Sequence, residues 1–264
     1  MKNKVLDSFD EAVADVPDGA SVVFQCWGIA GTPQNLILAL HEKGCKELTV
    51  ITHNFLPIPF SGEDSVSPTI LVPQMRKLIC PYARVGTSSG RISPVREAIV
   101  SGQLEVEVLS HGTLVERLRA GAGNLGGFYT PVGVGTVVEE GKERRLIDGK
   151  EYIFEKPLRP DFALVRAYKA DRYGNLIYRK SARSCNPIMA MASKVTIVEV
   201  DEIVEVGEID PDDVVTPHAF VDRIVKIPEG GIGSQQQRVE LLNKHLSAMR
   251  RRLAAETTQP EAGS

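Results

Sequence analysis

The chain has 264 residues, of which 42% are hydrophobic and 25% are charged, with a net charge of -3. This composition is ordinary for a globular protein, and it provides no basic field that would recruit nucleic acid or an anionic membrane. There is no apolar run of about 18 residues and no signal-peptide pattern at the start, so we expect a cytoplasmic protein. The four cysteines are scattered without a C-x-x-C pair, which favours free thiols over disulfides or zinc.

The first part of the chain predicts a β-α-β unit. Ser21–Cys26 is a nearly continuous β-branched and apolar run, which is typical of a strand buried on both faces of a parallel sheet. A helix follows, with Thr32 as the expected N-cap and Pro33 at its first position. A second strand is expected at 48–52. Parallel strands joined by a helix predict an α/β fold.

A glycine-containing turn, Gly28–Gly31, separates this first strand from its helix. Open α/β sheets bind ligands at the carboxyl ends of their strands, so Gly28 and Gly31 are candidate substrate-binding residues. A tight strand-to-helix turn is the plainer interpretation of G-x-x-G. The full G-x-G-x-x-G pattern and an acid placed for a ribose are both missing, which excludes a nicotinamide site.

The remaining elements follow from apolar patterns and turn residues. Prolines and small polar residues between 57 and 73 predict a long loop. The other expected elements are strands at 77–80, 105–109, 161–166, 176–178, 195–200 and 219–227, helices opened by Pro94 and Pro187, and a hairpin at 145–154 that turns at Asp148-Gly149.

The segment Gly112–Thr136 is unusually rich in glycine, with seven glycines and one short helical signal. Thr113 and Glu116 form a T-x-x-E pattern, which predicts a capping box, and Gly121 is expected to end that helix in the left-handed conformation. So many glycines indicate backbone that comes close to another backbone or to a ligand, although a compact turning loop is the alternative. The expected interface and loop residues are Gly121, Gly123, Phe128 and Tyr129.

The last predicted helix spans 235–256. Its apolar residues recur at intervals of three and four, so one face must be buried, either on its own domain or against another protein chain. Residues 257–264 are expected to be disordered. We therefore expect one α/β domain over 1–256 and a short tail.

Three segments resemble the A (alpha) subunit of family I CoA-transferases of the 3-oxoacid type, and they occur in the right order: 119–136, 164–183 and 195–207. The resemblance covers about 8–225, with a divergent patch between 54 and 101. It implies an α/β fold with a mainly parallel sheet flanked by helices, and a function in transferring CoA between an acyl-CoA and a carboxylic acid.

The resemblance also implies that the nucleophile is absent from this chain. Family I CoA-transferases use a glutamate that attacks the acyl-CoA, and in two-chain members it belongs to the B (beta) subunit. The nearest sequences here, at 140–141, 205–207 and 229–231, do not match its motif. A beta-subunit partner in a heterodimer or heterotetramer is therefore expected, with CoA as a substrate and no cofactor.

The same resemblance points to residues that hold the substrate acid. Where the family has Asn-Asn and Gln-Gly-Thr, this chain has His53-Asn54 and His111-Gly112-Thr113. Where the family has Gly-Gly-Phe-Gly, this chain has a tryptophan, Trp27, before Gly28. The candidate substrate-binding residues are therefore Trp27, Gly28, Gly31, His53, Asn54 and His111. Each histidine has a structural hydrogen-bonding role as its alternative.

Other functions remain open at this point. A CoA-thioester hydrolase or ring-opening enzyme on the same scaffold would let water replace the acid, with His53 or His111 as a base. A sugar-phosphate isomerase of related fold needs an acid-base pair and a phosphate loop, and we find no convincing set. A non-catalytic sensor usually carries a DNA-binding helix-turn-helix, and the sequence shows none.

Overall fold

The computed structural model describes residues 3–26, 30–55, 67–82 and 94–234, together with Gln237 and Glu240. Within these residues nine strands form one sheet in the order β1-β12-β11-β9-β2-β3-β4-β5, with β10 paired to β9. Within this nine-stranded sheet, β10–β9 is the only antiparallel pair among the described residues. The predicted mainly parallel sheet is confirmed. Its strands are β1 (Val5–Leu6), β2 (Ser21–Phe24), β3 (Leu48–Ile51), β4 (Met75–Cys80), β5 (Glu105–Val108), β9 (Phe162–Asp171), β10 (Leu176–Ile177), β11 (Val195–Val204) and β12 (Arg223–Lys226).

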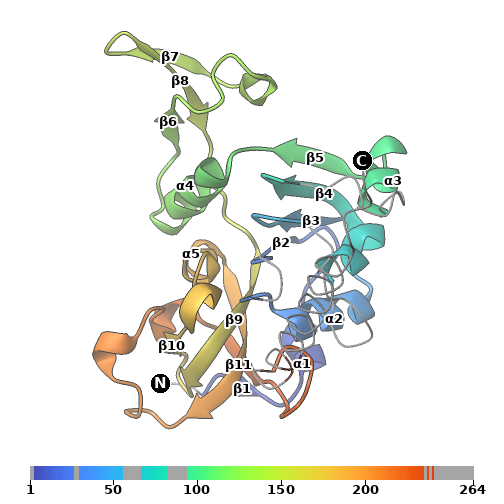
Figure 1. The fold of residues 1–264 in the computed structure, drawn as a ribbon, viewed down its shortest axis with the longest axis vertical. Coiled ribbons are helices and arrows are strands. Elements are labelled where there is room, and N and C mark those ends of the chain that lie inside the picture. Colours follow the sequence, from blue (N-terminus) through green and yellow to red (C-terminus); the bar gives the residue numbers. More distant parts are fainter. Residues whose placement is uncertain are drawn as a thin grey trace, which may run out of the picture.

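Helices cover both faces of this sheet (Figure 1). One face carries α1 (Phe9–Val13), α2 (Gln34–Lys43) and α3 (Pro94–Val100), whose apolar residues share one buried cluster. The other face carries α4 (His111–Ala122) and α5 (Asn186–Ala192), which share a second cluster. Two separate clusters on opposite faces explain why the central strands are apolar along their whole length.

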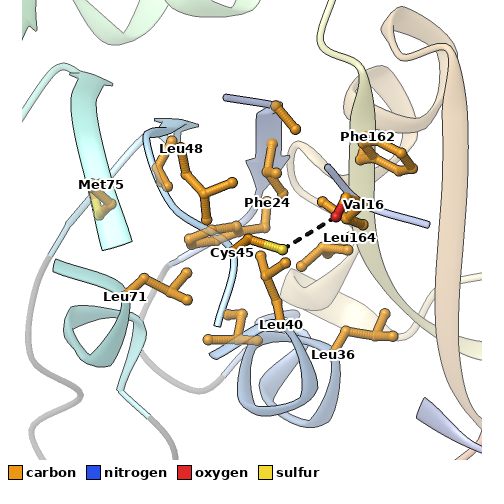
Figure 2. Close-up of a cluster of buried hydrophobic side chains, with 14 of the residues drawn as sticks. Val16, Phe24, Leu36, Leu40, Cys45, Leu48, Leu71, Met75, Phe162 and Leu164 are labelled. Atoms are coloured by element: carbon orange, nitrogen blue, oxygen red, sulfur yellow. Dashed lines mark hydrogen bonds between the residues drawn. The ribbon is translucent and has the colours of Figure 1, made fainter. Parts of the chain in front are cut away.

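The larger cluster packs α2 against the middle of the sheet (Figure 2). Leu36 and Leu40 of α2 are fully buried, as is Phe24 of β2. Burial of each such side chain contributes roughly 1.5–3 kcal/mol to folding. Cys45 lies in the same cluster and donates a hydrogen bond from its thiol to the Val16 carbonyl oxygen at 3.2 Å. All four cysteines are free, as the sequence predicts.

The start of α2 differs from the prediction. The helix begins at Gln34, and its N-cap is Pro33, whose side chain makes no capping hydrogen bond, so Thr32 is not the cap. The carboxylate of Glu199 on β11 accepts hydrogen bonds from the backbone N–H groups of Asn35 and Leu36 at 2.9 and 3.0 Å. A residue on a distant strand thus accepts from the first backbone N–H groups of the helix, which a nearby capping side chain normally does. A local sequence pattern cannot predict such a long-range contact.

The predicted ends of α4 are also wrong. Its N-cap is Ser110, whose hydroxyl accepts from the Thr113 N–H at 3.0 Å, while Glu116 bonds Arg119 instead of closing a capping box. Gly121 lies inside the helix and does not end it. A Cβ atom at this position would lie 1.9 Å from the Leu158 carbonyl oxygen. Gly121 is therefore required by the close approach of another backbone.

A second sheet protrudes from the body above α4 (Figure 1). Its described strands are β6 (Phe128–Thr130), β7 (Arg144–Ile147) and β8 (Lys150–Glu155), in the antiparallel order β6-β8-β7. The predicted hairpin is confirmed: Asp148 and Gly149 both have positive φ, 48° and 77°, as a two-residue turn requires. We call β6, β7 and β8 the small sheet.

Several other predicted boundaries change. Pro68–Gln74 is a 3₁₀ helix with Leu71 and Val72 buried, although its prolines predicted a loop. β9 and β11 are each ten residues long and extend beyond the predicted ends. β12 is shorter than predicted, because a 3₁₀ turn at His218–Phe220 precedes it. Apart from Gln237 and Glu240, both helical, the predicted C-terminal helix at 235–256 and the tail at 257–264 lie outside the described residues. Across the described residues, no helix combines the length and hydrophobicity needed to span a bilayer.

Candidate functional site

The candidate site lies where four parallel strands end. β2, β3, β4 and β5 are neighbours in register, so the segments that follow them meet at one edge of the sheet. His53 and Asn54 follow β3, and His111 follows β5 as the first residue of α4. The chain is tied together here, since Phe55 N–H donates to the Tyr82 carbonyl oxygen at 3.1 Å. The structure thus brings three of the predicted site residues to this carboxyl edge.

His53 and His111 differ in environment. His53 is 3% exposed, and burial together with the charge of His111 lowers its pKa to about 4. His111 is exposed. A group with that pKa is a neutral imidazole at neutral pH, with one nitrogen donating and the other accepting. His53 therefore offers a hydrogen bond and no positive charge.

Asn54 adds a second neutral polar group beside His53. Its side-chain oxygen is buried, and among the described residues it has no hydrogen-bond partner. Its backbone is fixed, because the Thr52 hydroxyl donates to the Asn54 carbonyl oxygen at 3.2 Å. A buried acceptor left unpaired costs roughly 1–3 kcal/mol, which a ligand that donates to it would recover.

The glycine turn beside this edge is fixed by protein contacts. Gly31 has φ of 70°, and a Cβ there would lie 2.4 Å from the Gln25 amide nitrogen and 2.6 Å from the Ala182 carbonyl oxygen. Gln25 itself is fully buried and donates to the Ala30 carbonyl oxygen at 2.9 Å. Packing within the chain explains the glycine at 31. Trp27 and Gly28 lie outside the described residues, so their predicted substrate contacts stay predictions.

The predicted interface residues belong to a different part of the molecule. Gly121 and Gly123 lie at the end of α4, while Phe128 and Tyr129 lie on β6 of the small sheet. Tyr129 meets the ring of Phe154 edge-on, with ring centroids 5.2 Å apart. Figure 1 shows this sheet apart from the ends of β2 and β3. The site residues therefore divide into two groups, at the carboxyl edge and on the small sheet.

Sequence reasoning missed the contribution of α5 to the turn. Asn186 is fully buried, and its side-chain amide donates to the carbonyl oxygens of Gly31 and Ala182 at 3.0 and 2.9 Å. The Cys185 N–H donates to the Gln25 side-chain oxygen at 2.9 Å. An asparagine before Pro187 looks like an ordinary helix start. The family resemblance over 164–183 is the one nearby signal, and it stops short of Asn186.

The sequence and the fold match those of a known family. The family model described as Coenzyme A transferase matches residues 6–227, so the chain belongs to that family, whose members are enzymes. It is 41% identical to the A subunit of 3-oxoadipate CoA-transferase from Pseudomonas putida, over 86% of this chain and 95% of that protein. It is 40% identical to the alpha subunit of acetate CoA-transferase from Escherichia coli, over 85% of this chain and 97% of that protein. The A subunit of a probable succinyl-CoA:3-ketoacid coenzyme A transferase from Bacillus subtilis is 42% identical, over 90% of this chain and 93% of its own length.

Solved structures agree on the fold. Glutaconate coenzyme A-transferase from Acidaminococcus fermentans aligns with a TM-score of 0.68 at 20% identity, over 88% of this chain and 78% of that one. A variant of the decarboxylase AibA/AibB aligns with a TM-score of 0.70 at 26% identity, over 97% of both chains. The predicted family and fold class are thus confirmed.

Proposed function

We propose that this chain is the A subunit of a two-subunit enzyme that transfers CoA between an acyl-CoA and a carboxylic acid. The observation that supports it most is identity of 40–42% to proteins named as the A or alpha subunits of CoA-transferases, over nearly their whole length. Those names imply a second subunit in each relative. Here the second subunit supplies the nucleophilic glutamate, and CoA enters as a substrate with no further cofactor.

The residues at the carboxyl edge support the assignment of the nucleophile to the second subunit. The described segments that follow β2, β3, β4 and β5 contain no Asp or Glu: 25–26, 30–33, 52–55, 81–82 and 109–113. This absence among the described residues supports a carboxylate nucleophile that comes to the edge from the second subunit and forms an acyl anhydride with the substrate. What the edge does contain is neutral hydrogen-bonding groups, which suit a ligand that arrives with its own negative charge.

His53, Asn54 and His111 hold the acid substrate in this proposal. Neutral His53 donates one hydrogen bond to a carboxylate, and the Asn54 amide offers donors and an acceptor beside it. His111 meets the acid from the exposed side. Donors fixed in advance around a reacting carboxyl group stabilise the charge that develops on its oxygens.

The first experiment tests the need for a partner. The chain is purified alone and together with the product of the adjacent reading frame, and each preparation is assayed with acyl-CoA and a free acid. We expect activity only from the pair, and inactivation by borohydride only after acyl-CoA is added, because the thioester on the glutamate then becomes reducible. Turnover by this chain alone would contradict the proposal. CoA release that does not depend on the acid would indicate a hydrolase.

A second experiment tests the role of His111. In the active complex, His111→Ala removes the imidazole, and alanine at the first position of α4 keeps the helix intact. Loss of a hydrogen bond to a charged carboxylate costs about 1.5–3 kcal/mol, which predicts a fall of roughly 10- to 100-fold in kcat/KM for the acid. The half-reaction with acyl-CoA should change less. Equal values for both proteins and both substrates would make His111 structural.

A further inference from the structure

One stretch beside the carboxyl edge is strongly basic. Residues 173–194 contain four Lys or Arg residues and no Asp or Glu, in a chain whose net charge is -3. Arg179, Lys180 and Arg183 lie within five residues of one another between β10 and α5, and all three are exposed. We call residues 179–183 the cationic loop. Such a cluster on one short loop creates a local positive field.

The cationic loop is attached to the glycine turn at the end of β2. The Asn186 side-chain amide donates hydrogen bonds to the carbonyl oxygens of both Ala182 and Gly31. The Cys185 backbone N–H donates a hydrogen bond to the Gln25 side chain. β2 pairs with β3 in register, Val23 opposite Ile51, so the residues that follow the two strands lie side by side. The loop is therefore a close neighbour of the segment that carries His53.

The loop is held in one shape. Lys180 and Ser184 have positive φ, 51° and 20°, a region that side chains other than glycine rarely occupy. Such conformations persist only where surrounding contacts maintain them, and they concentrate at ligand sites. The Arg179 guanidinium lies 5.1 Å from the ring centre of Tyr168, which fixes the start of the loop.

Two of the cations have no acidic partner among the residues that the structure describes. Within the described residues, neither Lys180 nor Arg183 forms a salt bridge, whereas many other described Lys and Arg side chains on the same sheet do. Guanidinium and ammonium groups recognise carboxylates through charge-assisted hydrogen bonds. A carboxylate from the substrate would find both cations available.

We propose that the cationic loop binds a second carboxylate of the substrate acid, so that the assembled enzyme prefers dicarboxylic acids to monocarboxylic acids. This rests on the proposed function, in which the reacting carboxyl group lies at His53, Asn54 and His111. The second carboxyl group of a short dicarboxylic acid is only a few bonds from the first, which matches a loop joined to the adjacent turn. The phosphates of CoA are separated from the thioester by the whole pantetheine arm and fit this position less well.

The test compares matched acids in the two-subunit complex. The acceptor pairs are succinate with butyrate, glutarate with valerate and adipate with hexanoate, which differ only in a carboxylate for a terminal methyl group. For wild type we expect the higher kcat/KM with the dicarboxylate in at least one pair. In Lys180→Gln/Arg183→Gln that preference should fall about tenfold, through KM for the dicarboxylate, with the monocarboxylate unchanged.

The matched control removes two positive charges at the opposite edge of the sheet. Lys43→Gln/Lys46→Gln changes two exposed residues, the last residue of α2 and one in the turn before β3, and the preference should stay at the wild-type value. An unchanged preference in Lys180→Gln/Arg183→Gln, or no dicarboxylate preference in wild type, would overturn the inference. So would a higher KM for acyl-CoA with every acid, which would assign the loop to the CoA phosphates. Inactivity of wild type with every acid would contradict the proposed function itself.

Discussion

The main sheet and the small sheet are stabilised in different ways. In β9 the first six residues, Phe162–Ala167, are all buried between helices on two faces. In the three described strands of the small sheet, only Ile153 and Glu155 are buried, while Leu146 is 68% exposed. Three strands need a covered apolar face for independent stability. Helices of this chain cover the main sheet on both faces, whereas no described helix covers an apolar face of the small sheet.

Charged and backbone contacts hold the small sheet instead. Arg117 of α4 donates from Nε to the Lys156 carbonyl oxygen at 2.8 Å and from Nη1 to Glu107 of β5 at 2.5 Å. Glu155 of β8 forms a salt bridge with Lys142 at 2.5 Å. Such contacts depend on geometry far more than apolar burial does, because a misplaced buried charge is costly. We therefore expect the stability of the small sheet to fall strongly after substitutions at its contact with α4.

The largest loss of stability should come from Gly121→Val, which adds a side chain at the contact between α4 and the segment after β8. The new side chain would collide with the Leu158 carbonyl oxygen, and α4 would have to move away from the chain that leaves β8. We expect the free energy of unfolding to fall by about 3 kcal/mol, as for severe overpacking. Urea denaturation of the purified chain measures it.

Gly126→Ala is the control for that substitution. Nothing lies within 4 Å of a Cβ at Gly126, and its φ is not in the left-handed region, so a change below about 0.5 kcal/mol is expected. Equal losses at 121 and 126 would show that the close approach of α4 does not limit stability.

The main sheet is tested through two buried groups whose pKa values shift in opposite directions. Burial raises the pKa of Glu199 to about 7, so the folded state binds the extra proton and stability falls as pH rises from about 4.5 to 7. Burial lowers the pKa of His53 to about 4, so stability falls as pH drops from about 6.5 to 4. Each group contributes up to about 3 kcal/mol across its window.

Two variants separate these effects. Relative to wild type, Glu199→Gln should gain stability between pH 5 and 8, since an amide oxygen still accepts from the start of α2. His53→Asn should instead gain relative stability as pH falls from 7 to 4. Denaturation midpoints measured over this range give both slopes. Curves parallel to wild type for either variant would contradict the burial of that group.

A smaller effect is expected from Glu155→Gln on β8. The change removes the carboxylate partner of the Lys142 ammonium and a longer ion pair with Arg117 at 3.8 Å, while Arg117 keeps its bonds to Glu107 and the Lys156 carbonyl oxygen. We expect a loss of about 1–2 kcal/mol, concentrated in the small sheet. Amide hydrogen exchange should show faster exchange in 144–155 and unchanged exchange in β9. Equal acceleration in both would mean that the two sheets unfold as one unit.

The smallest effect on stability is expected from Leu146→Ser. This side chain is already exposed, so the isolated chain should change by less than about 0.5 kcal/mol. If the partner subunit covers the small sheet, the same change should weaken assembly several-fold, and exchange over 112–136 should slow when the partner binds. Unchanged assembly and exchange would place the partner elsewhere.

The sequence predicts most strands of the main sheet, but it predicts poorly where the helices that connect them begin. Strands such as Ser21–Phe24 and Phe162–Asp171 are apolar along their length, and that pattern is local. The predicted starts of α2 and α4 are wrong, because Glu199 caps one helix from a distant strand and Ser110 precedes the expected cap of the other. The prolines of Pro68–Gln74 predict a loop where a 3₁₀ helix forms, since proline is common in both.

The candidate site is predictable in part for the same reason. His53, Asn54 and His111 follow strands, and parallel neighbours bring strand ends together, so their meeting follows from the predicted fold. The contact of Gly31 with Asn186 joins residues more than 150 positions apart. No periodicity carries that information. The cationic loop is visible in composition, but its position beside β2 is not.

The place of β9 in the sheet has a consequence for folding during synthesis. β9 pairs with β2, Val22 opposite Phe162, although about 140 residues separate them, and β1 pairs with β12 from the far end of the chain. β2, β3, β4 and β5 leave the ribosome first, so the free edge of β2 is exposed until β9 follows. Pairing over such sequence distances is slow, and open strand edges promote aggregation. The nascent chain is therefore most vulnerable between the emergence of β5 and that of β9, while the small sheet is being synthesised.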